Sequence, residues 1–468
     1  MDKFKVNMDI LFNPQSVAVI GASENPGKLG FHVMKSLTGG GYTGKIIPIN
    51  PGSPEILGFI AYPAVNEYDQ QIDLAIVVVP AKRVPAIFVE CVNKGIKGIV
   101  LITAGFKEID DPAGGDLHEE IAGIANASRI PVIGPNTFGM INFHSNLNAS
   151  FTPEFSRLKK GSICIVSQSG GISHLLGFMA MRVDVGFSKI VGLGNRLNVD
   201  FAQMLEYLMG DSDSKVIVLY IEGVDQPRDL IEQAKKYNSK KPIIAYKTGK
   251  GRVGDQASLS HTGSMAGRHE IYTGALTQAG ILTVDDTETL LDTAKAMASC
   301  PIPDSPGMAV LSGQAGPGMA ACDLCVDQGL KIVQFTQKTQ QKINERLPPL
   351  ALRTNPVDMG PAWYDSEAIE GIVRAVMDDD NVGGILFLMM FASANVDALK
   401  GISGLLEEWG QQKPVISCIL SPPGIWDKEI RALEESGALI NYLTPERATR
   451  AMANLWRYRK TQTRRKDH

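Results

Sequence analysis

Short runs of β-branched and other apolar residues alternate with helix-length amphipathic stretches along the whole chain. In the first third of the sequence these runs are SVAVIG, KIIPIN, DLAIVVVP, GIVLIT and PVIGPN. A strand that is apolar at every position is buried on both faces, which is typical of a parallel sheet with helices on both sides. The alternation of such strands with helices therefore predicts a doubly wound α/β architecture.

Polar and proline-rich breaks divide this pattern into three predicted domains. The first covers residues 1–150 and holds the strands named above. The second covers 151–300, and its strands are SICIVS, SKIVGLG, KVIVLYIE and KPIIAYK. The third covers 301–460, after the break CPIPDSPG, and its strands are MAVLSG, KIVQF, GGILFLM and PVISCIL. Residues 461–468 form a short basic tail.

Length, charge and cysteine content fit this division and exclude several classes of protein. At ~100–200 residues per domain, 468 residues correspond to about three domains. A net charge of −4 gives no reason to expect a nucleic-acid or membrane partner. The longest apolar stretch, residues 384–394, is shorter than the ~20 residues of a membrane span. The N-terminus has no signal-peptide pattern and six cysteines are no disulfide framework, so we expect a cytoplasmic protein.

A glycine-containing loop, GASENPGKLG, follows the first strand and precedes a helix-like run. Gly21, Gly27 and Gly30 permit a tight turn and a close backbone approach. The N-terminus of the next helix offers N–H groups and a positive dipole end to a phosphate. The alternative is a plain strand–helix turn, because glycines after a strand are common.

The second strand favours coenzyme A over NAD as the ligand of this loop. A dinucleotide site usually places Asp or Glu near the end of that strand, on the ribose diol. Here the strand ends in Asn50 and begins with Lys45. A cation and a neutral amide suit a phosphate-rich ligand with a phosphorylated ribose, such as coenzyme A.

Two later turns have the same strand–glycine–helix pattern. SQSGG, residues 167–171, follows the strand SICIV, and GQAGPG, residues 313–318, follows MAVLS. Both are turns of the anion-binding kind. Because each begins a different domain, we predict that they converge on one phosphate.

The segment 247–267 contains glycine, small and polar residues around a single histidine, His261. Its sizeable apolar side chains are Val253, Leu259 and Met265, so we expect an exposed and mobile loop. A structural histidine normally has a packed niche, which this segment cannot build. His261 is therefore a candidate catalytic residue, although exposed histidines without a function are also common.

The strand KVIVLYIE ends in Glu222, at the edge of a parallel sheet where active sites form. This carboxylate could accept a hydrogen bond from one imidazole nitrogen of His261. Such a bond fixes the tautomer and leaves the other nitrogen as a nucleophile. The alternative is a solvated charge at the end of a strand.

Together with AGFKE, GPNTFGMIN, SHTGSMAG, NPVD and PER, these segments resemble the ADP-forming acyl-CoA synthetases, a family related to succinyl-CoA synthetase. The similarity covers residues 10–455, and its most specific element is SHTGSMAG preceded by YIEG. It implies an N-terminal Rossmann-like CoA-binding domain. Two flavodoxin-like, succinyl-CoA-synthetase-like doubly wound domains are expected to follow.

The resemblance also implies roles for individual residues. His261 takes a phosphoryl group and Glu222 orients it. Coenzyme A is expected at Gly21, Ser23, Pro26, Gly27, Lys28, Lys45, Val79, Pro80, Thr103 and Asn136. Phosphate is expected at Ser169, Gly170, Gly316 and Gly318. No metal ligand is implied.

The implied reaction interconverts acyl-CoA, ADP and phosphate with carboxylic acid, ATP and coenzyme A. It proceeds through an acyl phosphate and then phosphorylated His261. Nucleotide binding in the family belongs to an ATP-grasp module, and nothing after residue 460 supplies one. The resemblance therefore implies a separate ATP-grasp β subunit that binds ADP or ATP with Mg²⁺, in a hetero-oligomer.

Departures from the family pattern leave the acid itself unpredicted. SQSGG and GNRLN stand beside the predicted acyl pocket, where relatives have SQSGA and GNKAD. His174 follows in a helix, where we expect it on the helix face, with contact to the substrate as the alternative. Two other functions stay open. A nonenzymatic acyl-CoA-binding protein is disfavoured by His261 and Glu222. An NAD(P)-linked Rossmann enzyme is disfavoured by Asn50.

Overall fold

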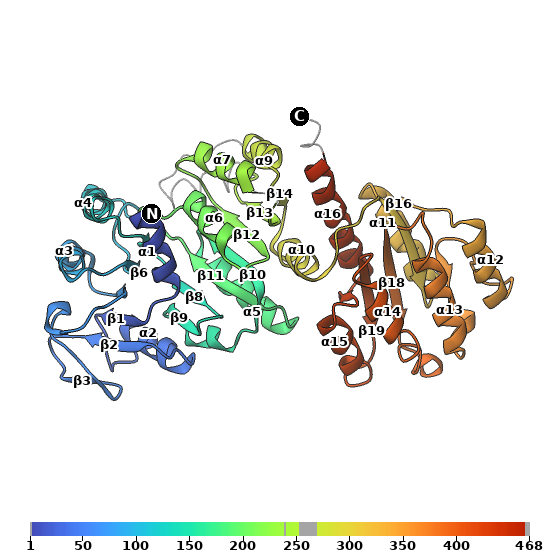
Figure 1. The fold of residues 1–468 in the computed structure, drawn as a ribbon, viewed down its shortest axis with the longest axis horizontal. Coiled ribbons are helices and arrows are strands. Elements are labelled where there is room, and N and C mark those ends of the chain that lie inside the picture. Colours follow the sequence, from blue (N-terminus) through green and yellow to red (C-terminus); the bar gives the residue numbers. More distant parts are fainter. Residues whose placement is uncertain (1, 238–239, 252–268, 464–468) are drawn as a thin grey trace. The chain divides into compact units, whose positions relative to one another are not determined.

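The structure is a computed structural model that describes residues 2–237, 240–251 and 269–463. Within these residues, every predicted strand is present, in three large sheets (Figure 1). The chain divides into two compact units, residues 1–287 and 288–468. The first unit holds the first two sheets, and the second unit holds the third.

The first sheet is parallel throughout and has the strand order β2-β1-β5-β6-β7. Its strands are β1 (Ser16–Ile20), β2 (Lys45–Ile49), β5 (Leu74–Val77), β6 (Gly98–Leu101) and β7 (Val132–Ile133). Beyond β2, Tyr62 forms a parallel bridge with Ile49, after a small hairpin of β3 (Glu55–Ile56) and β4 (Phe59–Ile60). This bridge supplies the third position of a Rossmann strand order, so the predicted Rossmann-like domain is confirmed.

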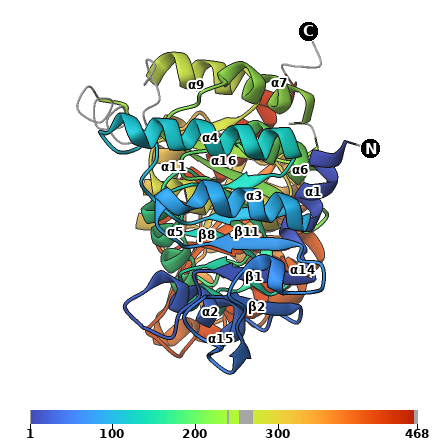
Figure 2. The ribbon, with the colours of Figure 1, turned by 90° about the vertical axis from the view of Figure 1, so that its left-hand side faces the viewer.

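Both faces of the first sheet are covered, as the uninterrupted apolar strands require. Along β1, Val17 and Val19 pack into a core with α1 and α2, whereas Ala18 and Ile20 pack into a second core with α3 and α4. Successive strand residues point to opposite faces, which explains this alternation. Figure 2 shows α3 and α4 lying side by side. The helices are α1 (Lys3–Phe12), α2 (Leu29–Gly39), α3 (Val84–Lys94) and α4 (Pro112–Ser128).

The second sheet has the order β14-β13-β12-β10-β11-β8-β9. Its parallel strands are β10 (Lys160–Ser167), β11 (Phe187–Gly192), β12 (Val216–Ile221), β13 (Ile243–Lys247) and β14 (Leu282–Val284). Its helices are α5 (Gly170–Arg182), α6 (Phe201–Gly210), α7 (Pro227–Tyr237) and α9 (His269–Gln278). Taken in sequence order, the parallel strands lie 2-1-3-4-5, which is the flavodoxin order.

The boundary between the first two sheets differs from the predicted one at residue 150. The strands β8 (Gly139–Asn142) and β9 (Leu147–Ser150) form a hairpin that extends the second sheet. β8 pairs with β11 in the antiparallel sense. The first sheet therefore ends before residue 139. The core that contains Val17 and Val19 of β1 also contains Met140 and Leu147 of the hairpin. This shared core joins the two sheets in one unit.

The third sheet, in the second unit, has the order β16-β15-β18-β19-β20, and β17 also pairs with β15. Its strands are β15 (Gly307–Ser312), β16 (Lys331–Ile332), β17 (Val357–Asp358), β18 (Gly384–Met390), β19 (Val415–Leu420) and β20 (Ile440–Asn441). The helices are α10 (Thr287–Ser299), α11 (Ala315–Asp327), α12 (Gln337–Arg346), α13 (Ser366–Met377), α14 (Ser403–Trp409), α15 (Asp427–Glu435) and α16 (Pro445–Thr463). The strand order again matches the flavodoxin type, as predicted.

The helix α10 joins the second unit, although the sequence placed it in the second predicted domain. Asp292 of α10 accepts two hydrogen bonds from Arg447 of α16, at 2.8 and 2.7 Å. Tyr442 donates to the carbonyl of Asp292 at 2.6 Å. These contacts explain why the unit boundary lies at residue 287 rather than at 300.

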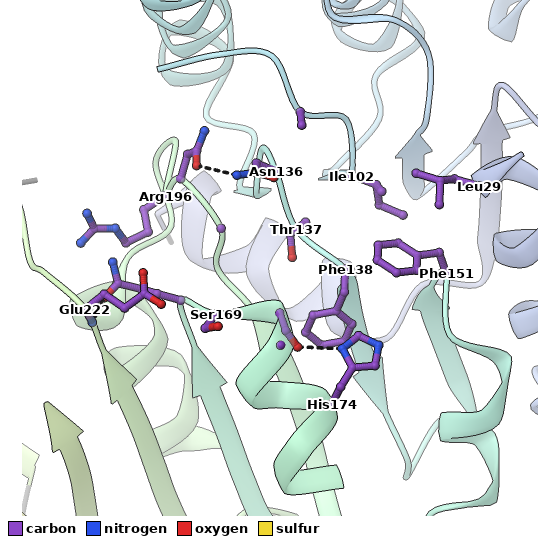
Figure 3. A pocket seen from close by; sticks show the side chains of 16 residues that line it. Leu29, Ile102, Asn136, Thr137, Phe138, Phe151, Ser169, His174, Arg196 and Glu222 are labelled. Carbon is purple, nitrogen blue, oxygen red and sulfur yellow. Dashed lines mark hydrogen bonds between the residues drawn. The ribbon is translucent and has the colours of Figure 1, made fainter. Parts of the chain in front are cut away.

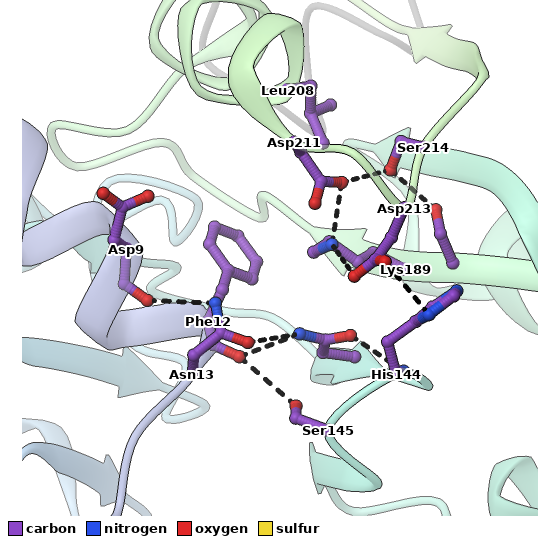
Figure 4. Close-up of polar contacts among 12 residues, drawn as sticks. Asp9, Phe12, Asn13, His144, Ser145, Lys189, Leu208, Asp211, Asp213 and Ser214 are labelled. Atoms are coloured by element: carbon purple, nitrogen blue, oxygen red, sulfur yellow. Dashed lines mark hydrogen bonds and ion pairs between the residues drawn. The ribbon is translucent and has the colours of Figure 1, made fainter.

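A buried polar cluster lies near the amino end of β11 in the first unit (Figure 4). The Lys189 side chain is 1% exposed, and its Nζ donates to Asp211 at 2.7 Å. Ser214 also donates to Asp211. Nearby, Asn142 of β8 donates to the carbonyl of Phe12, the last residue of α1, at 3.0 Å. The cluster therefore combines a desolvated ion pair with a link from the first helix to the second sheet.

Among the described residues, no helix is long and apolar enough to cross a membrane.

Candidate active site

A cavity of about 500 Å³ lies at the carboxyl ends of β1, β2 and β5 in the first sheet. We call it the first cavity. Five residues predicted to bind coenzyme A line it: Gly21, Ser23, Lys28, Val79 and Pro80. Pro26 and Gly27 belong to the same loop, in which the Gly27 amide donates to Asn25 at 2.8 Å. The structure thus brings most of the predicted set to one place.

The backbone around this cavity requires glycine at two positions. Gly21 has φ +95°, and an added Cβ would lie 2.9 Å from the Val78 carbonyl oxygen. A Cβ on Gly30 would lie 2.1 Å from the Gly21 carbonyl oxygen. The first turn of α2 therefore packs directly on the loop after β1. Lys28 caps α2 without a side-chain hydrogen bond, which leaves the helix N-terminus to an anion.

The chemistry of the lining fits a phosphate-rich nucleotide ligand. Lys28 and Arg83 supply cations, and Val79 and Ile87 supply apolar surface. Asn50 also lines the cavity and donates to the Ala22 carbonyl at 2.8 Å, where a dinucleotide site usually has a carboxylate. Arg83 was not predicted from the sequence, because its helical segment carries no glycine signal.

The strand register places Lys45 away from the first cavity. Lys45 is the first residue of β2 and pairs with Ser16, the first residue of β1. It therefore lies at the amino edge of the sheet, whereas the first cavity lies at the carboxyl edge. Its Nζ donates to Gln70. The position of Lys45 in the sheet therefore gives no support to the expected contact with coenzyme A.

Thr103 supports the sheet edge and is not among the residues that line the first cavity. Its hydroxyl donates to the Val79 carbonyl at 2.7 Å, and its carbonyl accepts from the Asn136 amide at 2.9 Å. Thr103 therefore connects the first cavity with the loop that carries Asn136.

A second cavity, of about 410 Å³, lies in the same unit. It brings together four predicted residues from distant parts of the sequence: Asn136, Ser169, Gly170 and Glu222 (Figure 3). Leu29, the first residue of α2, lines both cavities. The two cavities therefore adjoin at Leu29. The complete lining of the second cavity is Leu29, Ile102, Ala104, Asn136, Thr137, Phe138, Phe151, Gln168, Ser169, Gly170, Gly171, His174, Gly194, Asn195, Arg196 and Glu222.

The α5 N-terminus is one wall of the second cavity. Ser169 is the N-cap, and its hydroxyl accepts from the Ile172 amide at 3.4 Å. Ser167, the last residue of β10, donates through its hydroxyl to the Ser169 carbonyl at 2.9 Å. These bonds fix the turn and aim the first helical turn at the cavity. Its N–H groups and dipole favour an anion there.

Two side chains hold the backbone at Glu222. Gln168 Oε1 accepts from the amides of Glu222, at 2.6 Å, and Gly223, at 3.1 Å. Arg196 donates to the Gly223 carbonyl at 2.7 Å. Neither role was predicted, since Gln168 and Arg196 act through backbone groups far away in the sequence.

The charges beside Glu222 are largely compensated. Arg196 is 5% exposed and pairs with Asp225 at 3.0 Å and with Asp200 at 3.5 Å. Burial raises the pKa of Asp200, although Arg196 acts in the opposite direction. Burial and the charge of Glu222 raise the pKa of Tyr220 to about 12, so this phenol is neutral at physiological pH.

His174 also lines the second cavity, which favours the alternative that it contacts the substrate. Its Nδ1 lies 2.7 Å from the Gly170 carbonyl oxygen, and its Nε2 lies 2.8 Å from the Thr152 hydroxyl. Phe138 and Phe151 surround the ring. The departure SQSGG followed by His174 was the only sequence signal for this wall.

The third sheet repeats the Ser–Gln turn of the second sheet. Ser312 ends β15 and donates to the Gln314 carbonyl, and Gln314 Nε2 donates to the Met390 carbonyl at 2.9 Å. Gly316 and Gly318 lie in the first turns of α11. Met390, the last residue of β18, donates through its amide to Gln314 Oε1 at 3.2 Å, as Glu222 does to Gln168 in the second sheet. The two turns belong to different units, so their convergence on one phosphate stays a prediction.

His261 lies outside the described residues.

Comparisons with known proteins agree with this geometry. Residues 15–142 match a family model described as a CoA binding domain, and residues 160–297 match a succinyl-CoA ligase like flavodoxin domain. An α subunit of ADP-forming acetate–CoA ligase II from Pyrococcus furiosus is 37% identical over 444 residues, which cover 94% of this chain and 95% of the relative. The chain belongs to the ADP-forming acyl-CoA synthetase family.

Other members of the family show the same extent of similarity. An ADP-forming acetate–CoA ligase of Methanocaldococcus jannaschii is 37% identical over 95% of this chain, but the chain spans only 62% of that relative. An acetyl-coenzyme A synthetase of Ca. Korarchaeum cryptofilum, solved with phosphate and ADP, is 32% identical. Its TM-score is 0.90, and 97% of each chain is covered. The family assignment therefore extends over all three sheets.

Proposed function

We propose that the chain is the catalytic α-type subunit of an ADP-forming acyl-CoA synthetase. The observation that carries the proposal is that the first and second cavities adjoin at Leu29. A coenzyme A whose phosphates lie beside Lys28 in the first cavity can extend its thiol end past Leu29. The thioester then reaches the cavity that holds Glu222 and the α5 N-terminus.

The chemistry begins with attack of inorganic phosphate on the thioester carbonyl. The carbon–sulfur bond breaks, and the products are an acyl phosphate and coenzyme A. In the second cavity, the N–H groups of the α5 first turn and the Ser169 cap bind the phosphate oxygens. Gly170, at the first helical position, permits close approach of the anion. Asn136 also lines this cavity, and its side-chain amide can donate to the same oxygens.

In the next step, the imidazole of His261 takes the phosphoryl group from the acyl phosphate and releases the carboxylate. Glu222 accepts a hydrogen bond from the other ring nitrogen, fixes the tautomer and stabilises the charge that develops on the ring. The phosphorylated histidine then transfers the group to ADP. Each step is reversible, so the same residues serve acid activation.

The direct test is formation of phosphohistidine. The purified chain is incubated with labelled phosphate and an acyl-CoA, and labelled peptides are mapped at alkaline pH because phosphohistidine is acid-labile. We expect label on His261 in the wild-type chain and none in a His261→Asn variant. Label elsewhere, or equal label in His261→Asn, would contradict the assignment. A nonenzymatic CoA-binding protein would bind acyl-CoA without any labelling.

The site for ADP, with Mg²⁺, is proposed to lie on an ATP-grasp β subunit, and the working form to be a hetero-oligomer in the cytoplasm. The longer Methanocaldococcus relative supports this proposal, because the chain spans only 62% of its length and the rest leaves room for a further module. The α chain alone should bind coenzyme A but should not turn over. Steady acyl-CoA formation from acid, ATP and coenzyme A by the purified single chain would refute the subunit assignment.

A further inference from the structure

Two amides at the second cavity have no acceptor within their own helix. α5 begins at Gly170, so the amides of Gly170 and Gly171 precede the first intrahelical hydrogen bonds. Both residues line the cavity. Among the described residues, an added Cβ would lie 3.8 Å from the nearest non-adjacent atom, in Phe138 for Gly170 and in Ser169 for Gly171. The packing of the chain therefore does not require glycine here, and the absent side chains leave room for a ligand at these amides.

Gln168 adds a further donor at the same cavity. The residue is 6% exposed and is part of the cavity lining. Its Oε1 accepts from the amides of Glu222 and Gly223, which fixes the orientation of the carboxamide, because an NH₂ group cannot accept these bonds. Its Nε2 is buried and has no hydrogen-bond partner among the described residues. A buried donor without a partner is costly, so it indicates a group that binds something the chain does not supply.

A glutamine in the third sheet shows the satisfied alternative. Gln314 accepts through Oε1 from the Met390 amide, and its Nε2 donates to the Met390 carbonyl at 2.9 Å. In the second sheet, the carbonyl at the corresponding strand end, that of Gly223, accepts from Arg196 and not from Gln168. The carboxamide of Gln314 is thus satisfied at one strand end, whereas that of Gln168 keeps its N–H groups for a ligand.

These donors suit a tetrahedral oxyanion. Helix-terminal N–H groups and the helix dipole attract anions and repel cations. A phosphate presents several oxygen atoms in different directions, so the α5 amides and Gln168 Nε2 can each bind a different one. Arg196 also lines the cavity, but its charge is shared with Asp225 and Asp200. Neutral donors therefore supply much of the recognition of the anion.

We propose that Gln168 is a phosphate-binding residue, whose Nε2 donates to an oxygen of the phosphate held at the α5 N-terminus. This role rests on the proposed function and deepens it. One carboxamide then connects two parts of the site, because Oε1 holds the backbone of Glu222 and Nε2 holds the phosphate. After attack on the thioester, the same N–H group stays on a non-bridging oxygen of the acyl phosphate. Gln168 itself neither gains nor loses a proton.

The experiment measures phosphate affinity separately from catalysis. Labelled inorganic phosphate is dialysed to equilibrium against the full chain in the presence of saturating coenzyme A. The coenzyme fills the first cavity, where Lys28 and Arg83 would otherwise attract phosphate. Without an acyl group no turnover occurs. Thermal unfolding and coenzyme A calorimetry are measured on every variant.

Two substitutions of Gln168 remove the donor in different ways. Gln168→Glu keeps an acceptor for the two amides, which also favour the ionised carboxylate. Phosphate affinity should fall at least about 10-fold, because a hydrogen bond to a charged group is lost and a like charge is added. Gln168→Met is uncharged and of similar length, and it should lower phosphate affinity by about 10-fold. Coenzyme A affinity should keep its wild-type value in both variants, since Gln168 does not line the first cavity.

Gln203→Glu is the matched control. Gln203 Oε1 accepts from the Asp200 amide at 3.1 Å in the capping box of α6, an arrangement in which Glu serves as well as Gln. The variant adds the same charge to the same unit, but Gln203 is not among the residues that line the second cavity. Its phosphate affinity should equal that of the wild type.

The outcomes separate the role of Gln168 from the proposed function. Wild-type phosphate affinity in either Gln168 variant, or an equal loss in Gln203→Glu, would overturn the role. A wild-type chain that binds no phosphate beside coenzyme A would also overturn it. If one variant does not fold, the other decides. Weaker phosphate binding in the Gln168 variants alone supports the role even if the wild type forms no phosphohistidine with acyl-CoA, a result that would contradict only the proposed catalysis.

Discussion

Gln168 Oε1 accepts a hydrogen bond from the Glu222 amide at 2.6 Å, and this contact joins the end of β10 to the end of β12. The same oxygen accepts from the Gly223 amide at 3.1 Å. One carboxamide therefore sets the direction in which the backbone carries the Glu222 side chain into the second cavity. Through this oxygen, Gln168 therefore affects the chemistry by positioning Glu222 and not by contact with a reacting atom.

We expect Gln168→Leu to slow phosphohistidine formation, because Glu222 loses its fixed orientation. Removing the acceptor also leaves two buried N–H groups unpaired, which costs about 1–3 kcal/mol of unfolding free energy. Coenzyme A affinity serves as the control, since Gln168 does not line the first cavity. Labelling at the wild-type rate would contradict the positioning role.

Glu222→Gln tests the carboxylate itself. The substitution keeps shape but removes the charge that holds the imidazole tautomer, so we expect phosphohistidine formation to fall by about 10²–10⁴-fold. The folded state should be unaffected, and thermal unfolding measures that. A fully active Glu222→Gln chain would exclude the orienting role of this residue.

Lys28 and Lys45 form a matched pair for coenzyme A binding. Lys28 lines the first cavity, whereas Lys45 lies at the opposite edge of the same sheet. Lys28→Ala should weaken coenzyme A binding by about 3–10-fold at low salt, and less at high salt because exposed phosphate contacts are screened. Lys45→Ala should bind like the wild type.

The measurement is calorimetry on the full chain with coenzyme A and, in parallel, with NAD. Equal losses in Lys28→Ala and Lys45→Ala would indicate a general charge effect and not a site. Tighter binding of NAD than of coenzyme A would reverse the ligand assignment.

Acid should destabilise the first unit through Asp211. Burial acts to raise the pKa of this carboxyl, but hydrogen bonds from Lys189 and Ser214 outweigh it and lower the pKa overall. A carboxyl whose pKa is lower in the folded than in the unfolded state contributes its full stabilisation of the fold above its unfolded-state pKa, which is about 4. That contribution is lost as the pH falls below about 4 through the folded-state value. Urea midpoints measured across this range check the direction.

Lys189→Met should lower the unfolding free energy at neutral pH by about 3–5 kcal/mol, because it leaves Asp211 desolvated without its cation. It should also remove the part of the acid response that comes from Asp211. Lys5→Met is the control, since the Lys5–Glu206 pair is exposed to solvent and contributes little to stability. Equal effects of the two variants would contradict a special role for the buried pair.

All the predicted strands were found, and most of them are continuous apolar runs of the kind that burial on both faces requires. The hairpin β8–β9 was missed although it is equally buried, because its sequence carries buried polar residues. Asn142 donates to the Phe12 carbonyl, and Asn148 donates to the Thr152 carbonyl at 3.1 Å. Buried polar side chains whose hydrogen bonds are satisfied within the fold leave no apolar pattern in the sequence.

In the candidate site, Ser169, Gly170 and Glu222 could be predicted from their positions just after two strands. Those strands, β10 and β12, are neighbours in the flavodoxin order. Lys45 was expected at the first cavity because its residue type was weighed without its position along the strand. His174 was underrated because its partner Thr152 is 22 residues away. Nothing local in the sequence indicates that bond.

The hairpin β8–β9 has a practical meaning for anyone who wishes to exchange parts between relatives. A cut at residue 150 would leave the coenzyme-binding fragment with β8 and β9 but without β11, the strand with which β8 pairs. The remaining fragment would have β11 as an unpaired edge strand. Such edges invite pairing with other chains and aggregation. A chimera must therefore carry the hairpin together with its host strand β11, and with Phe12, whose carbonyl is bonded to Asn142. We therefore expect residues 1–287 to be transplantable only as one piece.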